Sequence, residues 1–274
     1  MPWFPDFVNA AELARRADGS AGRADPVGRY LTALNDGDAR GLEKLWPGNV
    51  VVHDPRAGEI RSHRQLRRLV RQTRSWLADH DAHIETVAAT CVGARAVVEL
   101  VAHLDGDGRA STWPVAVVAE SHGETSIDFR TYCSQVPIDG RHHLRPPILP
   151  PGDFRLGDVV GRYQAAMEAG DAEEAVSTFA SDGYVREPVD ASDTHRGAGE
   201  LRSYFTRCFS TGGGISAQVC QVTDDGVSSA VEYNCVRWGG RDVPVQAGLA
   251  VYERGPDGLL AAARVYDDIE APVA

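Results

Sequence analysis

Two carboxylates, each followed by proline and each preceded at the same spacing by a tyrosine, are the clearest candidates for chemistry in this chain. Tyr30 precedes Asp54, and Tyr163 precedes Glu187. A carboxylate can remove a proton from carbon beside a carbonyl, while a neutral phenol donates a hydrogen bond to the oxygen that gains charge. The pattern therefore indicates acid/base proton transfer on a carbonyl compound.

The two sets belong to two copies of one repeat. The segment VGRYLTALNDGDARGLEKLW, starting at Val27, matches VGRYQAAMEAGDAEEAVSTF, starting at Val160, without a gap. The acid–proline pair, a His-Arg pair and a late Arg-x-Tyr then follow in the same order in both copies. Several coincident positions in one order indicate an internal duplication.

Hydrophobic periodicity changes once within each copy. In the first copy, Val27, Tyr30, Leu31 and Leu34 follow helical spacing, and two further helical runs precede a series of strand-like runs. This order predicts an α+β fold in which about three N-terminal helices pack on a curved, mainly antiparallel sheet. We expect a ligand to enter between the helices and the sheet.

A proline-rich stretch between the copies predicts an extended spacer. The expected organisation is an N-terminal extension at 1–24, a first domain at 25–137, a linker at 138–156 and a second domain at 157–274.

The motifs resemble those of ketosteroid isomerases, which combine RYxxxxxxGD with a later acid–proline pair. They stand here as Arg29-Tyr30, Gly37-Asp38 and Asp54-Pro55, and again as Arg162-Tyr163, Gly170-Asp171 and Glu187-Pro188. The resemblance extends to SnoaL-like polyketide cyclases and nuclear transport factor 2. It implies two tandem NTF2-like cone domains that pair within the chain as a pseudo-dimer, with a homodimer as an alternative.

In ketosteroid isomerases the tyrosine is an oxyanion donor and the acid is the base, so the resemblance implies these roles for Tyr30 with Asp54 and for Tyr163 with Glu187. That family's second donor, a protonated aspartate on a later strand, has no counterpart in PVAVVA or PVQAGLA. Steroid-type isomerisation is therefore not expected.

SnoaL-like cyclases use an acid on a late strand as general acid/base, and ARVYDD resembles their ending. This implies that role for Asp267 or Asp268, of which only one can face the pocket because neighbouring strand residues point opposite ways. The first copy has Cys133-Ser134 there, which favours the second copy as the working site.

Further residues are expected around the substrate: His53, His63, His195, Arg264, Phe179 and Trp46. Arg264 with Asp267 or Asp268 also provides material for an epoxide hydrolase of the limonene-epoxide-hydrolase type. A non-catalytic ligand-binding or scaffold protein is the remaining alternative to an isomerase, cyclase or lyase.

Five arginines form a cationic stripe at helical spacing in the third predicted helix: Arg64, Arg67, Arg68, Arg71 and Arg74. Attraction of a phosphopantetheine arm or an acidic carrier protein is one interpretation, and a solvated helix face is the other.

The amino-acid composition limits the classes of molecule that this protein is expected to bind. A net charge of −11 disfavours nucleic acid, and neither an apolar leader nor a membrane-spanning run is present in the sequence. Five cysteines without a CxxC pair favour a reduced, cytoplasmic protein. No GxSxG, P-loop or GxGxxG motif occurs, so we expect a small apolar molecule as partner, without cofactor or metal.

Overall fold

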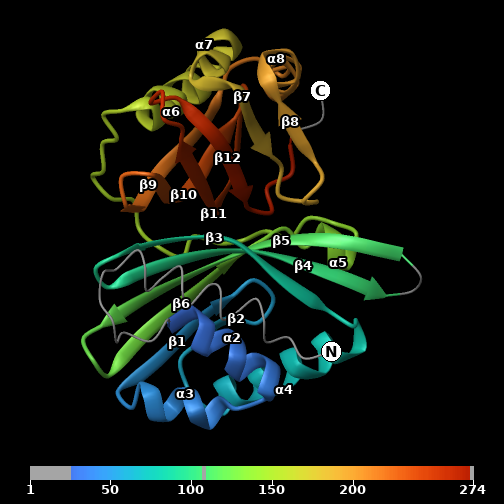
Figure 1. Ribbon diagram of the computed structural model, residues 1–274, viewed down its shortest axis with the longest axis vertical. Coiled ribbons are helices and arrows are strands. Elements are labelled where there is room, and N and C mark those ends of the chain that lie inside the picture. Colours follow the sequence, from blue (N-terminus) through green and yellow to red (C-terminus); the bar gives the residue numbers. More distant parts are fainter. Residues whose placement is uncertain (1–25, 107–108, 272–274) are drawn as a thin grey trace. The chain divides into compact units, whose positions relative to one another are not determined.

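The computed structural model describes residues 26–106 and 109–271, which form two units that divide between Cys133 and Ser134. Each unit contains one six-stranded sheet. Each sheet is accompanied by helices of its own unit (Figure 1). This is the tandem arrangement of NTF2-like α+β domains that the repeat predicts.

The first unit begins with its helices and ends with its long strands. Its elements are α2 (Pro26–Asp36), α3 (Ala39–Leu45), β1 (Asn49–Asp54), β2 (Gly58–Ile60), α4 (His63–Asp79), β3 (His83–Val92), β4 (Arg95–Gly106), β5 (Arg109–His122) and β6 (Ser126–Tyr132). The sheet order is β2-β1-β6-β5-β4-β3. The β1–β6 pair is parallel and the other pairs are antiparallel.

The second unit repeats this plan after a short additional helix. Its elements are α5 (Val136–Asp139), α6 (Val159–Ala169), α7 (Ala172–Ser177), β7 (Phe179–Arg186), β8 (Thr194–Arg196), α8 (Gly197–Cys208), β9 (Ile215–Asp224), β10 (Ser228–Trp238), β11 (Arg241–Arg254) and β12 (Leu260–Tyr266). The order β8-β7-β12-β11-β10-β9 reproduces the first sheet strand for strand. In Figure 1, α2, α3 and α4 gather on one face of the first sheet, and α6, α7 and α8 gather on one face of the second.

The repeated Gly-Asp pair has a local structural cause. Gly37 and Gly170 adopt left-handed backbone conformations, with φ of 75° and 72°, at the ends of α2 and α6. Asp38 then accepts a hydrogen bond from the Gly41 N–H at 2.9 Å, which caps α3. Asp171 caps α7 in the same way.

The proline-rich stretch is hydrogen-bonded along the second sheet and is not a free spacer. The Leu149 carbonyl accepts from the Asn234 amide at 3.0 Å, and the Gly152 N–H donates to the Val219 carbonyl at 2.8 Å. These bonds attach the segment to β9 and β10. None of the helices in the described ranges combines the length and apolar composition needed to cross a membrane.

Candidate active site

A cavity of about 600 Å³ lies between the helices and the sheet of the first domain. Tyr30 from α2 and Asp54 from the end of β1 both line it. Much of the remaining lining is apolar, contributed by Leu69 and Trp76 of α4 and by the inward faces of β3, β4 and β5. Its volume falls within the range of small-molecule sites.

Tyr30 is held rigidly by its neighbours. Its ring stacks on Phe129 of β6 at a centroid distance of 4.2 Å, and its side chain is almost wholly buried. Burial, and then the negative charge of Asp54, raise the pKa of Tyr30 far above its usual value. The phenol therefore stays protonated at neutral pH and keeps its O–H as a potential hydrogen-bond donor.

Asp54 is oriented by the turn that follows it. Its Oδ1 accepts hydrogen bonds from the backbone N–H groups of Arg56 at 2.8 Å and Ala57 at 2.7 Å. The turn leads directly into β2, so the carboxylate is fixed where β1 ends. Two backbone N–H groups thus set the orientation of this carboxylate.

The rim of the cavity is polar. Exposed side chains of Arg56 in the β1–β2 turn and of Gln65, Arg68 and Gln72 on α4 line this part. The exposure of these four residues identifies the gap between the turn and α4 as the mouth.

The second domain fills the corresponding volume with aromatic rings. Phe205, which aligns with Thr73, belongs to the buried core with Tyr163, Phe179 and Tyr252. The Tyr163 ring lies 5.6 Å from Phe179, 6.0 Å from Phe205 and 5.4 Å from Tyr252, between ring centroids. Tyr163 is thus part of an aromatic core in this domain.

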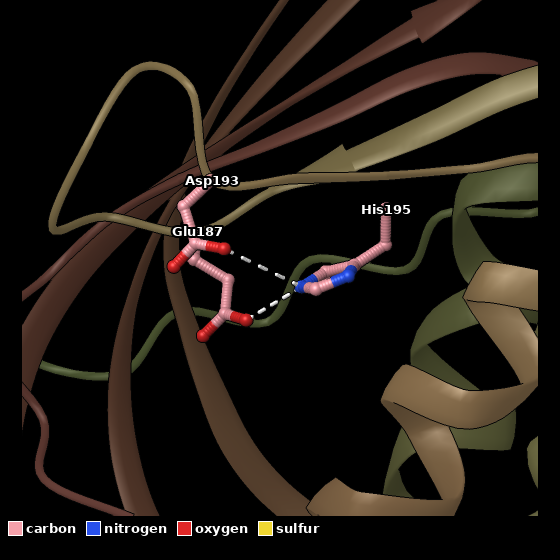
Figure 2. A group of neighbouring side chains, drawn as sticks. All are labelled: Glu187, Asp193 and His195. Carbon is pink, nitrogen blue, oxygen red and sulfur yellow. Dashed lines mark hydrogen bonds and ion pairs between the residues drawn. The ribbon is translucent and has the colours of Figure 1, made fainter.

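Glu187 is engaged in an ion-pair cluster. Its Oε1 lies 2.6 Å from His195 Nε2 and accepts from Arg207 Nη2 at 2.8 Å. Figure 2 shows Glu187 and Asp193 on the same side of the His195 ring. Burial, then Cys208 and Tyr163, and then the charge of Glu187 raise the pKa of Tyr204. The pKa of Tyr163 is raised by burial and then by Tyr252 and Cys208.

Glu187, Asp193 and His195 each offer one potential metal ligand, and the three atoms lie within 4.8 Å of one another. The Arg207 guanidinium already donates to the same Glu187 oxygen, at 2.8 Å. A cation of the chain thus balances this carboxylate, and we assign the cluster to an ion-pair network.

Asp267 and Asp268 face opposite sides of the second sheet. Asp267 accepts a hydrogen bond from the buried Tyr233 hydroxyl at 2.5 Å, and burial raises its pKa to about 6. Asp268 accepts from the Ser134 hydroxyl at 2.8 Å and from the His143 N–H at 2.8 Å. Asp267 therefore faces the domain interior, whereas Asp268 fastens the segment that follows α5.

The sequence pattern of the SnoaL-like domain matches the chain twice, over residues 27–124 and 160–263. Together these stretches make up more than half of the 274 residues. The chain belongs to the SnoaL-like domain family. No curated protein sequence matches it.

Several solved structures are similar to parts of this SnoaL-like protein. A Sinorhizobium meliloti protein named as a candidate polyketide cyclase is 22% identical, covers 40% of this chain and 94% of its own, and has a TM-score of 0.33. An epoxide hydrolase/cyclase-like enzyme of salinomycin pyran-ring formation is 22% identical, with 39% and 86% covered and a TM-score of 0.34. A Mycobacterium tuberculosis protein is 12% identical, with 41% and 94% covered and a TM-score of 0.34.

Several residues predicted to contact substrate lie elsewhere in the two SnoaL-like domains. Trp46 packs edge-on against Phe129 at 5.6 Å, and Phe179 belongs to the second core. His63 is exposed and lies 3.3 Å from Glu43, between Nδ1 and Oε1. The reason is that sequence order places a residue near a turn or a helix end but does not fix the direction of its side chain.

Alternation along the strands corrects two further predictions. His53 precedes the cavity-lining Asp54 on β1 and points to the opposite face. Arg264 alternates with Val265 on β12 and pairs through Nη1 with Glu253 at 2.9 Å, on the face opposite Asp267.

Sequence reasoning missed the helix residues that shape the cavity. Gln72, Thr73, Trp76 and Arg68 all line it from α4. The signal was present in the repeat, because aligning the two His-Arg pairs places Thr73 opposite Phe205. A small residue in one copy, aligned with a large residue at the same core-facing position of the other copy, indicates more open space in the first of these two SnoaL-like domains.

Proposed function

We propose that the first SnoaL-like domain is a cofactor-independent acid/base catalyst that acts on a small apolar carbonyl compound, as an isomerase, cyclase or lyase. One observation supports this above the others: the Tyr30 phenol and the Asp54 carboxylate line the same largely apolar cavity of about 600 Å³. The second domain, with Tyr163 in a filled core and Glu187 in an ion-pair cluster, is not the working site in this proposal.

The reaction divides between these two groups. Asp54 takes a proton from the carbon next to the carbonyl; the electron pair of that C–H bond forms the C=C bond of an enolate, and the carbonyl π pair moves onto the oxygen. Tyr30 donates a hydrogen bond to this oxygen as it gains negative charge. In an isomerisation the Asp54 proton returns to another carbon and the carbonyl re-forms. In a cyclisation the enolate carbon attacks a second carbonyl of the same molecule, whose oxygen then takes the proton from Asp54.

The apolar lining strengthens both interactions. Water is excluded by side chains such as Leu100, Val115 and Val117, so the charge on the enolate is poorly solvated except at Tyr30. Thr73, which also lines the cavity, carries a further neutral hydroxyl. The site thus favours substrates whose C–H is already acidified.

Hydrogen–deuterium exchange at the α-carbon of small apolar ketones, followed by NMR in D₂O, tests the proposal without knowledge of the natural substrate. We expect the wild-type protein to accelerate exchange. Asp54→Asn is expected to reduce the rate by about 10² or more, and Tyr30→Phe by about 10–10². Both changes are nearly isosteric, so melting temperatures should stay close to the wild-type value.

The second domain supplies matched controls. Glu187→Gln and Tyr163→Phe make the same chemical changes at the aligned positions and are expected to leave exchange unaltered. Exchange that survives Asp54→Asn would overturn the assignment of the base. Ketones that bind in the cavity but show no accelerated exchange would identify a ligand-binding protein instead.

A further inference from the structure

Charged side chains line the mouth of the first-domain cavity. Among the described residues, its lining contains one carboxylate, Asp54, and two guanidinium groups, Arg56 and Arg68. The whole chain has a formal net charge of −11. Arginines at the mouth of an apolar cavity therefore contrast with the general charge of this protein.

Arg68 differs from its neighbour on the same helix. Arg67 forms a two-pronged ion pair with Glu43, with Nε and Nη2 at 2.9 and 2.7 Å from the carboxylate oxygens. In the described part of the chain, Arg68 has no hydrogen-bond or ion-pair partner, although it lines the cavity. Its guanidinium is thus available to an anion that enters the mouth.

The two rim cations are absent from the domain whose interior is filled. Alignment places Val189 opposite Arg56 and Glu200 opposite Arg68. Glu200 accepts a hydrogen bond from the Arg196 N–H at 2.7 Å, at the start of α8. Among the described residues, the rim arginines therefore accompany the cavity of the first domain, and the aligned positions beside the aromatic core of the second domain carry no cation.

We infer that the ligand of the first domain is an amphipathic anion, with an apolar body in the cavity and a carboxylate or phosphate group held at the mouth by Arg68. This inference rests on the proposed use of the cavity as a substrate site. Tyr30 and Asp54 then act on a carbonyl within the apolar body, while Arg68 selects the charged end and fixes the depth of insertion.

A pair of fluorescent probes that differ by one charged group tests the inference: 8-anilinonaphthalene-1-sulfonate and the neutral N-phenyl-1-naphthylamine. Arg68→Glu is expected to weaken the sulfonate by at least about tenfold, because a charge-assisted hydrogen bond is replaced by repulsion. The neutral probe should change by less than about twofold. Wild-type affinity for the sulfonate alone should fall as salt is added.

Arg71→Glu is the matched control, because Arg71 is an exposed arginine of the same helix that does not line the cavity. It makes the same charge change and should alter sulfonate affinity by less than about twofold. Equal losses in the Arg68 and Arg71 variants, or no loss in either, would overturn the role of Arg68.

Competition against the sulfonate probe distinguishes a carboxylate from a phosphate as the charged group of the ligand. Decanoate and decyl phosphate are compared with decan-1-ol, and at least one anion should displace the probe about tenfold better than the alcohol. The better anion identifies the end group. Equal displacement by all three compounds would show that the mouth does not select an anion.

Thr73→Phe distinguishes failure of this inference from failure of the proposed function. It introduces the residue type that Phe205 provides in the second domain, and should abolish binding of both probes. If Arg68→Glu has no effect but Thr73→Phe removes binding, the cavity remains the proposed substrate site. Only the inference that its ligand is an anion is then overturned. If both probes still bind the folded Thr73→Phe variant, the proposed site itself is wrong.

Discussion

The two domains have the same strand order, yet their interiors differ in kind. Where the first domain has Thr73 and Leu100, the second has Phe205 and Tyr233. Phe205 is completely buried, and Tyr233 packs against the same aromatic core. The first domain keeps a cavity of about 600 Å³ at this level. A few side chains, exchanged for larger ones, separate an open cavity from an aromatic core on one backbone plan.

The candidate carboxylates of the two domains also differ in their surroundings. Asp54 is held by two backbone N–H groups beside an open cavity, whereas Glu187 is paired with His195 and Arg207. Asp267 is the interior acid of the second domain, and its partner is a buried tyrosine hydroxyl. A carboxylate in this fold is therefore defined by its neighbours rather than by its place in the repeat.

Removing a ring from the aromatic core of the second domain should have the largest effect on the difference between the two domain interiors. Phe205→Ala removes a completely buried ring and should cost about 3–5 kcal/mol of unfolding free energy. Urea denaturation followed by tryptophan fluorescence measures this loss. A cost below about 1 kcal/mol would mean that the second domain is not tightly packed at this position.

The buried Asp267 predicts a dependence of stability on pH that originates in the second domain. Burial raises its pKa to about 6, partly opposed by the Tyr233 hydrogen bond, with Asp268 and His142 as nearby charges acting in opposite directions. Because unfolded aspartate titrates near 4, the folded state holds the extra proton between about pH 4 and 6. The contribution of protonated Asp267 to the free energy of unfolding is fully present below about pH 4. It is lost as pH rises through about 6, which lowers the unfolding free energy by roughly 3 kcal/mol.

Asp267→Asn is the direct comparison for that titration. Asparagine keeps an oxygen that accepts from Tyr233 but does not ionise, so the variant should gain stability relative to wild type as pH rises from about 4 to 7. Unfolding free energies of both proteins, measured across this range, show the difference. A constant difference would exclude Asp267 as the titrating group.

A close contact in the second sheet gives a smaller effect. Gly248 lies opposite Tyr233 in the β10–β11 register, and a Cβ placed there would approach the Tyr233 ring to 2.6 Å. Gly248→Ala should cost about 1–3 kcal/mol, because the ring must shift within a filled core. Denaturation midpoints report this cost. The Tyr233→Leu background should relieve it, and no relief would place the strain elsewhere.

The smallest effect is expected at the first-domain position aligned with Phe205. Thr73→Ala trims a side chain that borders open space, so the unfolding free energy should change by no more than about 0.5 kcal/mol. The same denaturation assay, run beside Phe205→Ala, compares the two positions directly. Similar costs at both positions would remove the distinction between an open and a filled interior.

The fold was predictable because it depends on local patterns. Helical spacing from Val27 onward, the Gly-Asp stop and cap at Asp38 and Asp171, and the later strand runs each follow from short-range rules. Their recurrence in order predicted two α+β domains. Strand alternation likewise implied that Asp267 and Asp268 face opposite ways.

Which copy holds the cavity was not predictable in the same way. Sequence order favoured the second domain because of its additional acids, whereas the cavity with a tyrosine and a carboxylate lies in the first. Motif spacing places Tyr30 and Tyr163 identically along the chain. What surrounds them depends on rings contributed by distant helices and strands.

The amino-acid sequence by itself determined the duplication, the elements of each domain and which strand residues share a face, since these depend on neighbours a few positions away. Tertiary packing decided whether the space beside each tyrosine is open or filled, and which carboxylate is neutralised by an arginine such as Arg207. The physical reason is that free volume and ion pairing are set by side chains far apart in the chain, whose sizes and directions combine only in the folded domain.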